Sequence, residues 1–299
     1  MVTRNILVFG GGGQVGQALL HTPLPTGLNL IAPPREACDI TDAGDLARAM
    51  HEGKPDLVIN TAAIAGIEAC EENPDLAMRV NFEAVAAMAA HCTERSIPFI
   101  QISTDYVFDG ADGAPPYLPD AAMNPLNVYG HSKMMGEEAA RHGTHWHVIL
   151  RTALVFSAFG ENILTRTLRG IDTQDEITVA ADQVASPTGA EFLAEGTLAV
   201  AAALLGGKSG GFGTFHLAGG PPASRFDFLQ AVMESYAPFT ERRPTLIAGK
   251  AANMPKRIPR PLYSALDCEK IHAVYGIAQR GWRDDLARAV RQLAARKAA

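Results

Sequence analysis

The chain has 299 residues, of which 47% are hydrophobic and 19% are charged, a composition typical of a soluble globular protein with a sizeable core. Its formal net charge of −6 provides no basic field that would favour nucleic acid or an anionic membrane. No apolar run approaches the ~20 residues of a membrane-spanning helix, and the N-terminus lacks a signal-peptide pattern, so we expect a cytoplasmic protein.

The first half of the chain alternates short apolar runs with helical patterns. Strands are expected at residues 5–10, 28–32, 55–63, 98–104 and 147–156, and helices at 14–23, 42–53, 73–96 and 125–142. Alternation of this kind predicts parallel strands joined by right-handed crossovers. The fold class is therefore expected to be α/β, with a Rossmann-type doubly wound sheet.

After about residue 156 the alternation gives way to loop-rich stretches such as "GGKSGGFG" and "LAGGPPAS". The end of the chain is an amphipathic helix with Leu286, Val290 and Leu293 on its inner face. We expect residues 1–155 to form a dinucleotide-binding domain. Residues 156–299 are expected to form mainly a smaller substrate-binding lobe, with some segments returning to the first domain.

Neither the cysteines nor the histidines form a convincing metal site. The four cysteines, which are widely scattered and contain no CxxC pair, are Cys38, Cys70, Cys92 and Cys268. They are typical of reduced thiols, not of a disulfide framework or a zinc site. His145 and His147 form a His-x-His pair, but without carboxylates or cysteines nearby they are more typical of one face of a strand end.

The stretch "GGGGQVG" follows the first expected strand and opens the first expected helix. Its glycines match G-x-G-x-x-G at Gly11, Gly13 and Gly16, and a second spacing uses Gly10. Glycines here permit a tight turn and close approach of the backbone to a pyrophosphate, and the helix N-terminus offers unpaired amides to the phosphates. A plain glycine turn is the alternative, but the strand–helix context favours a dinucleotide site.

The end of the second expected strand decides which nicotinamide cofactor is favoured. An acidic residue at that point would bind the ribose 2′-hydroxyl of NAD, whereas an arginine accommodates the 2′-phosphate of NADP. The sequence is "IAPPREACDI", in which Arg35 comes before Glu36 and Asp39. We therefore expect NADPH to be favoured and NADH to be tolerated, the alternative being that Arg35 is only a solvated loop charge.

Two further motifs supply groups for the reduction of a carbonyl. "STDYVFDG" follows the fourth expected strand, and Ser103 and Thr104 can donate hydrogen bonds to a carbonyl oxygen as it gains negative charge. "NVYGHSK" places Tyr129 and Lys133 one helical turn apart. A tyrosine can supply the proton, and a nearby ammonium is expected to lower the pKa of its phenol toward neutral pH.

These motifs, together with "CEENPDLAMRVN", "ADQVASPTGAEFLAE" and "RPLYSALDCEKI", resemble the extended short-chain dehydrogenase/reductase superfamily, and within it the dTDP-4-dehydrorhamnose reductases. The resemblance implies that Tyr129 is the proton donor, Lys133 its partner and Thr104 the contact of the substrate carbonyl. It implies Asn81 as a support of the site and assigns the substrate to Thr104, Asp105 and Leu154. The residues expected to contact the cofactor are Gly10, Gly13, Gln14, Val15, Gly16, Arg35, Asp39, Ile40, Ala62, Ala63, Tyr129 and Lys133.

Two positions depart from the family pattern. The family usually has a tryptophan near the sugar where this chain has Leu154, and some members hold magnesium at a dimer contact with a glutamate where this chain has Ala18. We therefore expect no metal ion, and we expect a raised KM for the rhamnose precursor unless Tyr106 or Phe156 fills the space that the tryptophan would occupy. A helix-rich surface is compatible with a homodimer, although the sequence does not establish one.

The resemblance implies NAD(P)H-dependent reduction of the 4-keto group of a nucleotide-linked deoxysugar, here dTDP-4-dehydro-L-rhamnose. Two alternatives remain open at this point. One is a non-catalytic, cofactor-binding regulatory subunit similar to the beta subunit of methionine adenosyltransferase. The other is a nucleotide-sugar epimerase of the same superfamily.

Overall fold

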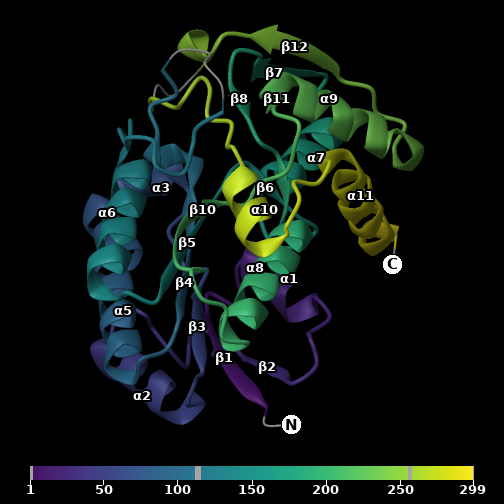
Figure 1. The fold of residues 1–299 in the computed structure, drawn as a ribbon. Helices are drawn as coiled ribbons and strands as arrows, with labels where there is room; N and C mark the ends of the chain where they lie inside the picture. Colours follow the sequence, from purple (N-terminus) through teal and green to yellow (C-terminus); the bar gives the residue numbers. More distant parts are fainter. Residues whose placement is uncertain (1–2, 112–115, 255–257, 299) are drawn as a thin grey trace.

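The computed structural model describes residues 3–111, 116–254 and 258–298. Its centre is a six-stranded sheet in the order β10-β5-β4-β3-β1-β2, in which every neighbouring pair is parallel (Figure 1). The strands are β1 (Arg4–Phe9), β2 (Leu28–Ile31), β3 (Leu57–Asn60), β4 (Phe99–Thr104), β5 (His147–Thr152) and β10 (Gly213–His216). This order, with helices on both faces, confirms the predicted α/β doubly wound fold.

Side chains alternate between two apolar layers along each strand of the sheet. Ile6 and Val8 of β1 face one core, whereas Leu7 and Phe9 face the other. The first core is closed by α1 (Gln14–His21) and α8 (Ala190–Leu205), and the second by α2 (Ala43–Gly53), α5 (Ala84–Arg95) and α6 (Val128–Gly143). Strands buried on both faces explain why they appear in the sequence as short, continuously apolar runs.

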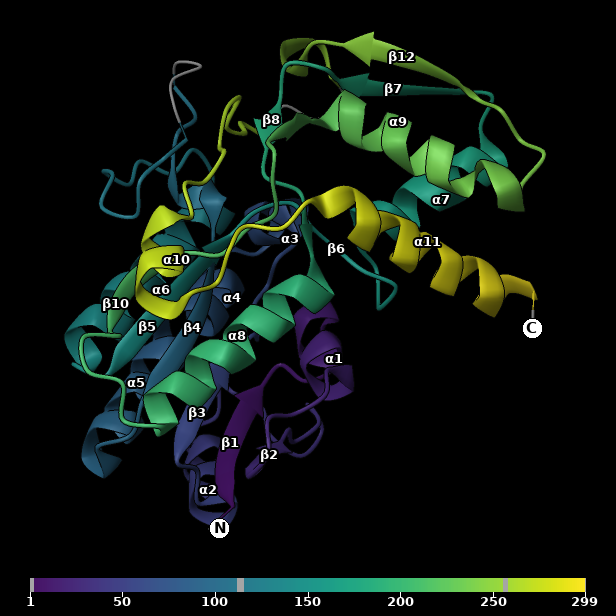
Figure 2. The same ribbon diagram turned by 45° about the vertical axis from the view of Figure 1, so that its right-hand side comes forward.

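Two parts of this layered unit come from the second half of the chain. Strand β10 extends the sheet beside β5, and α8 packs against α1 across its face (Figure 2). Helix α10 (Glu269–Tyr275) packs on β10. The sequence offered a periodic pattern for none of these three elements, since β10 is only four residues long and α8 is apolar on nearly every side.

A second, smaller group of elements lies beyond the carboxyl ends of the strands (Figure 2). It contains α7 (Ile163–Thr173), α9 (Arg225–Tyr236), α11 (Trp282–Ala298) and the parallel pair β7 (Glu176–Ala180) and β12 (Thr245–Gly249). Its core joins Leu164, Phe228 and Leu286 with other residues from the three helices. Leu286 and Val290 are fully buried there and Leu293 packs at the edge, as the amphipathic pattern predicted.

Short strands connect the two groups of elements. They are β6 (Val155–Phe156), which pairs with β9 (Thr188–Gly189), and β8 (Val184–Ala185), which pairs with β11 (Ala223–Ser224). The predicted single strand at 147–156 is wrong, because β5 ends at Thr152 and β6 starts at Val155. Leu154 lies in the break with φ +42°, a left-handed conformation that a strand cannot contain.

The predicted helix at 73–96 is a continuous helical segment made of α4 (Pro74–Met78), a π-helical turn at Arg79–Glu83 and α5. Ahead of it lies α3 (Ile67–Glu72), which the sequence did not predict. Within the residues that the structure describes, no helix is long and apolar enough to cross a bilayer. All four cysteines are free thiols in buried positions.

Candidate active site

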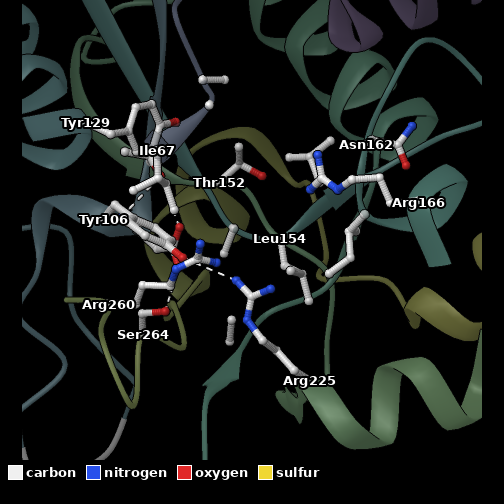
Figure 3. Close-up of a pocket in the computed structure, with 18 of the residues that line it drawn as sticks. Ile67, Tyr106, Tyr129, Thr152, Leu154, Asn162, Arg166, Arg225, Arg260 and Ser264 are labelled. Carbon is white, nitrogen blue, oxygen red and sulfur yellow. Dashed lines mark hydrogen bonds between the residues drawn. The ribbon is translucent and has the colours of Figure 1, made fainter. Parts of the chain in front are cut away.

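A cavity of about 900 Å³ opens where the carboxyl ends of the sheet strands face the second group of elements. In doubly wound folds the crevice at the carboxyl ends of the strands is the place where ligands bind. Figure 3 shows Tyr129 and Tyr106 on one side of this cavity, Arg166 and Asn162 on the opposite side, and Thr152 and Leu154 between them. Its size is appropriate for a cofactor and a substrate together.

The glycine turn forms one end of the cavity. Gly10 has φ +85°, and a side chain there would come within 2.4 Å of the backbone nitrogen of Ala62. A Cβ at Gly16 would lie 2.2 Å from the carbonyl oxygen of Gly10. Helix α1 can therefore pack this closely on the turn only because residues 10 and 16 are both glycine. Helix α1 has no side-chain cap and no acidic residue in its first turn. Its free amides, at Gln14 and Val15 in the cavity wall, therefore fit the pyrophosphate of a dinucleotide.

The end of β4 brings three polar side chains to the cavity wall. Ser103, Thr104 and Asp105 all line the cavity and are almost fully buried. The Thr104 hydroxyl accepts from the amide of Tyr106 at 3.2 Å and donates to Asp105 Oδ1 at 3.1 Å. The other carboxylate oxygen of Asp105 accepts from the Ser264 hydroxyl at 2.5 Å. Burial raises the pKa of Asp105 to about 6, although the bonds from Ser264 and Thr104 partly oppose this shift.

Tyr129 and Lys133 reach the same wall from α6. The helix starts here because the side chain of Asn127 caps it, accepting from the amide of Gly130 at 2.9 Å. Gly130 lets the helix approach the 3-10 turn at Asp105–Val107 that follows β4, since a Cβ there would lie 2.2 Å from the carbonyl oxygen of Tyr106. The Lys133 ammonium donates to the Ile102 carbonyl at 2.7 Å, which fixes it beside the end of β4.

The direction of the Tyr129 pKa shift differs from the sequence prediction. Burial raises the pKa of this phenol above its usual value; the neighbouring Thr104 hydroxyl opposes the shift and the Asp105 carboxylate adds to it. Burial also lowers the pKa of Lys133 to about 8, against the opposing charge of Glu137. The prediction considered only the attraction between phenolate and ammonium, and it omitted the desolvation that both groups experience.

Asn81, on the π-helical turn, connects the loop after β3 to α6. Its amide side chain accepts from the Ile64 amide at 2.9 Å and donates to the Ile64 carbonyl at 3.0 Å. It also donates to the Ser132 hydroxyl of α6 at 2.9 Å. A Cβ at Gly136 would lie 2.2 Å from the Asn81 carbonyl oxygen, so α6 rests directly on this turn. π-helical turns are frequent at functional sites, and this one holds the loop after β3 against the helix that carries Tyr129.

Beneath Lys133 lies a buried ion pair that the sequence did not predict. Glu137, one turn further along α6, accepts from Arg151 Nε at 2.8 Å and from Arg151 Nη2 at 2.7 Å. The same carboxylate accepts from Ser103 at 2.6 Å and from Arg141 at 2.6 Å. These bonds hold the pKa of Glu137 below its usual value despite complete burial. The network therefore links α6 to the ends of β4 and β5, the elements that carry the site.

The opposite wall comes from the second group of elements. Arg166 of α7 and Arg225 of α9 line it, and Arg225 donates to the Tyr106 hydroxyl at 3.2 Å. A third arginine of the cavity, Arg260, lies on the Tyr106 side, where it donates to Glu68 at 2.7 Å (Figure 3). The guanidinium of Arg166 makes no hydrogen bond within the described ranges. Apolar side chains that include Leu154 and Ile177 fill the space between them. Sequence reasoning missed the arginines, because they lie in separate segments without a shared spacing or motif.

Not all of the predicted site residues lie in the cavity wall. Those that do are Gly13, Gln14, Val15, Ala63, Thr104, Asp105, Tyr129, Lys133 and Leu154. Those outside it are Gly10, Gly16, Ala62, Arg35, Asp39 and Ile40, of which Gly10, Gly16 and Ala62 pack in and against the glycine turn. Arg35 and Asp39 are exposed beyond the end of β2, and Asp39 accepts from the backbone and side chain of Thr41.

Phe156 cannot replace the missing tryptophan of the family pattern. It is 1% exposed and packs against Phe228 in the core of the smaller group of elements, with its ring centroid 5.4 Å from that of Phe228. Phe156 and Leu154 do not share a strand face, since the left-handed backbone at Leu154 breaks the alternation of side chains. Tyr106 does line the cavity, with its ring 5.7 Å from that of Tyr129.

For a metal ion, the described part of the chain has no group of three or more His, Cys, Asp or Glu side chains in a suitable arrangement. The absence of a metal therefore stays a prediction. Ala18 is buried in the first core, where it packs with Leu19 beneath the sheet. His147 bonds to the Thr144 carbonyl through Nδ1 at 2.7 Å, and burial lowers its pKa.

The parallel sheet, the uncapped helix after the glycine turn and the Thr104–Tyr129–Lys133 set together define an NAD(P)-dependent oxidoreductase of the extended short-chain dehydrogenase/reductase class. Comparison with known proteins narrows this class. Residues 4–295 match the model of the RmlD substrate binding domain. The chain therefore belongs to the RmlD family.

Curated relatives cover nearly the whole chain. A dTDP-4-dehydrorhamnose reductase of Burkholderia thailandensis is 35% identical over 96% of this chain and 98% of its own length. One from Sinorhizobium fredii is 33% identical over 95% of this chain and 96% of its own length. The crystal structure of a dTDP-4-dehydrorhamnose reductase from Clostridium acetobutylicum, 28% identical, superposes with a TM-score of 0.88 over 97% of this chain and 99% of that one.

Proposed function

We propose that the protein uses NADPH to reduce the 4-keto group of dTDP-4-dehydro-L-rhamnose and so forms dTDP-L-rhamnose. The observation that carries the proposal is the position of Tyr129, Lys133 and Thr104 at one sheet edge, in the same cavity as the uncapped N-terminus of α1. Relatives named dTDP-4-dehydrorhamnose reductase support this choice of sugar and nucleotide.

Bound NADPH would supply the hydride to the keto carbon, and the chain's own residues would supply the proton and the electrostatics. Tyr129 donates its phenolic proton to the oxygen, since a phenol with its ordinary pKa of ~10 is already protonated at neutral pH. The Lys133 ammonium stabilises the phenolate that remains after transfer. The Thr104 hydroxyl, next to the phenol, orients the keto oxygen for the transfer.

The choice between cofactors rests on Arg35. This residue is exposed just past β2, where the ribose phosphate of NADP would lie in a doubly wound fold. Helix α1 would hold the pyrophosphate through its free backbone amides. Its first residues, Gln14 and Val15, line the cavity. A neighbour of the same fold, a Bacillus anthracis dTDP-4-dehydrorhamnose reductase, was crystallised in complex with NADP.

The second group of elements would hold the nucleotide part of the substrate. A diphosphate carries two negative charges, and Arg166 and Arg225 bring two guanidinium groups to the cavity from α7 and α9, while Arg260 adds a third from the Tyr106 side (Figure 3). This assignment makes the segment after residue 155 mainly a substrate lobe, apart from α8, β10 and α10. The same proposal places the enzyme in the cytoplasm, where NADPH is available.

A direct assay tests the proposal. Purified protein is mixed with dTDP-4-dehydro-L-rhamnose and either NADPH or NADH, and oxidation of the cofactor is followed by the loss of absorbance. We expect turnover with both cofactors and a higher kcat/KM with NADPH. Stable cofactor binding without consumption would favour a regulatory subunit, and sugar isomerisation without net cofactor use would favour an epimerase.

A further inference from the structure

Three hydroxyl side chains stand at the ends of β4 and β5 beside the cavity, and they differ in the partner to which each donates its single hydrogen. Ser103 donates its hydrogen to Glu137 at 2.6 Å. Thr104 donates to Asp105 at 3.1 Å. Thr152, at the end of β5, has no hydrogen-bond partner for its hydroxyl oxygen in the described structure. Thr152 is therefore the hydroxyl at this edge whose donor capacity remains available.

The position of Thr152 relates it directly to the proposed chemistry. It is the register partner of Thr104 across the parallel strands β4 and β5, so both side chains project from the same face of the sheet. It lines the cavity, and Figure 3 shows it between Tyr129 and Leu154. The residue is only 5% exposed, so water has little access to its hydroxyl.

A buried hydroxyl without a partner destabilises the protein that contains it, and a valine of the same shape would remove that penalty. Threonine can also satisfy the hydroxyl by exchanging its methyl and hydroxyl positions through rotation to another staggered rotamer. Because Thr152 borders the cavity, such a rotation can turn the hydroxyl toward a bound molecule. The Thr152 hydroxyl then donates a hydrogen bond only when a ligand occupies the cavity.

We propose that Thr152 is a further hydrogen-bond donor to the keto oxygen of the sugar, acting beside the proton donor Tyr129. This inference rests on the proposed function, because it assumes a keto sugar at the sheet edge. The Thr152 hydroxyl keeps its proton and stabilises the negative charge that develops on the oxygen during hydride transfer. Thr104, already bonded to Asp105 and to the Tyr106 amide, then acts mainly by positioning.

The test compares Thr152→Val with Thr152→Ser in the holoenzyme, using NADPH and dTDP-4-dehydro-L-rhamnose. Valine keeps the shape and removes the donor, so we expect kcat to fall about 10- to 100-fold. Serine keeps the donor, and its kcat should stay within a few-fold of the wild type. The melting temperature of Thr152→Val should equal or exceed that of the wild type, since the buried hydroxyl is gone.

Fluorescence titration with NADPH tests whether Thr152 contacts the cofactor instead of the sugar. We expect the Kd for NADPH to be the same in both variants and the wild type. An unchanged kcat in Thr152→Val, a rise in KM alone, or a weakened Kd for NADPH would each overturn the inference. If the wild type itself does not oxidise NADPH with this sugar, the proposed function fails and the inference fails with it. An active wild type with an equally active valine variant overturns the Thr152 inference alone.

Discussion

The two walls of the cavity are built in different ways. The wall at the sheet edge carries Thr104, Tyr129 and Lys133 on a regular strand and a capped helix, supported by a buried ion pair and by Asn81. The opposite wall takes Arg166 and Arg225 from two helices far apart in the chain, and Arg260 reaches the Tyr106 side of the cavity from a third, separate segment (Figure 3). Reacting groups are thus held by continuous rigid elements, whereas substrate recognition is assembled from separate pieces.

The largest expected effect lies on the rigid wall. Tyr129→Phe removes the proton donor without changing the shape of the ring, so kcat should fall about 10²- to 10⁴-fold. The Kd for NADPH should remain near the wild-type value, because the change does not touch the glycine turn. Rapid-mixing measurement of cofactor oxidation gives kcat, and a variant that keeps the wild-type rate would remove Tyr129 from its proposed role.

Changes on the opposite wall should affect binding rather than turnover. Arg225→Gln and Arg166→Gln each remove one charge from the rim, and charge-assisted bonds to phosphate contribute enough that KM for the sugar should rise about 10- to 100-fold. We expect kcat to change little, since ground state and transition state lose the contact alike. Arg48→Gln, at an exposed position on α2, is the matched control and should leave both constants unchanged. A fall in kcat at constant KM would contradict the division between the walls.

On the sheet-edge wall, the buried carboxylate of Asp105 is expected to lower the stability of the folded protein at neutral pH. Its pKa is raised to about 6 in the folded protein, whereas the unfolded value stays near 3.8. Between these pH values the folded state binds more protons, so wild-type stability falls as pH rises toward 6 and stays lower above it. Asp105→Asn should therefore raise the free energy of unfolding at pH 7 by on the order of 1–3 kcal/mol and by much less at pH 4.

Denaturant unfolding at the two pH values measures this difference for Asp105. The exposed residue Asp120 provides the control, and Asp120→Asn should show the same stability change at both pH values. A destabilised Asp105→Asn protein at pH 7 would mean that the bonds from Ser264 and Thr104 outweigh the desolvation of the carboxylate.

The smallest expected effect concerns Leu154, where the two walls meet. If a ring at this position contacts the sugar, Leu154→Trp should lower KM for the rhamnose precursor by several-fold to about tenfold, with kcat little changed. The left-handed backbone at Leu154 is unfavourable for leucine and tryptophan alike, so the exchange adds no new backbone strain. Loss of activity in this variant would indicate a pocket shaped for a different sugar.

The sequence predicted the rigid wall well because its signals are local. A glycine turn between a strand and a helix, a capped helix and a four-residue spacing each depend on neighbours in the chain, and Tyr129 and Lys133 lie where these signals put them. The Arg151–Glu137 pair, the fit of Arg225 beside Tyr106 and the break at Leu154 depend on contacts between distant segments. Such contacts have no periodic signal, and desolvation, which reverses the expected pKa shift of Tyr129, depends on the completed fold.

The position of β10 has a consequence for how the chain is made. β5 ends at Thr152, but the strand that pairs with its outer edge begins only at Gly213. At a synthesis rate of ~5–20 residues per second, β10 leaves the ribosome roughly 3–12 s after β5. During that interval β5 is the open edge of a five-stranded sheet, with unpaired amides and carbonyls that can template association with another chain. The nascent sheet therefore carries an additional open strand edge until residues 213–216 emerge.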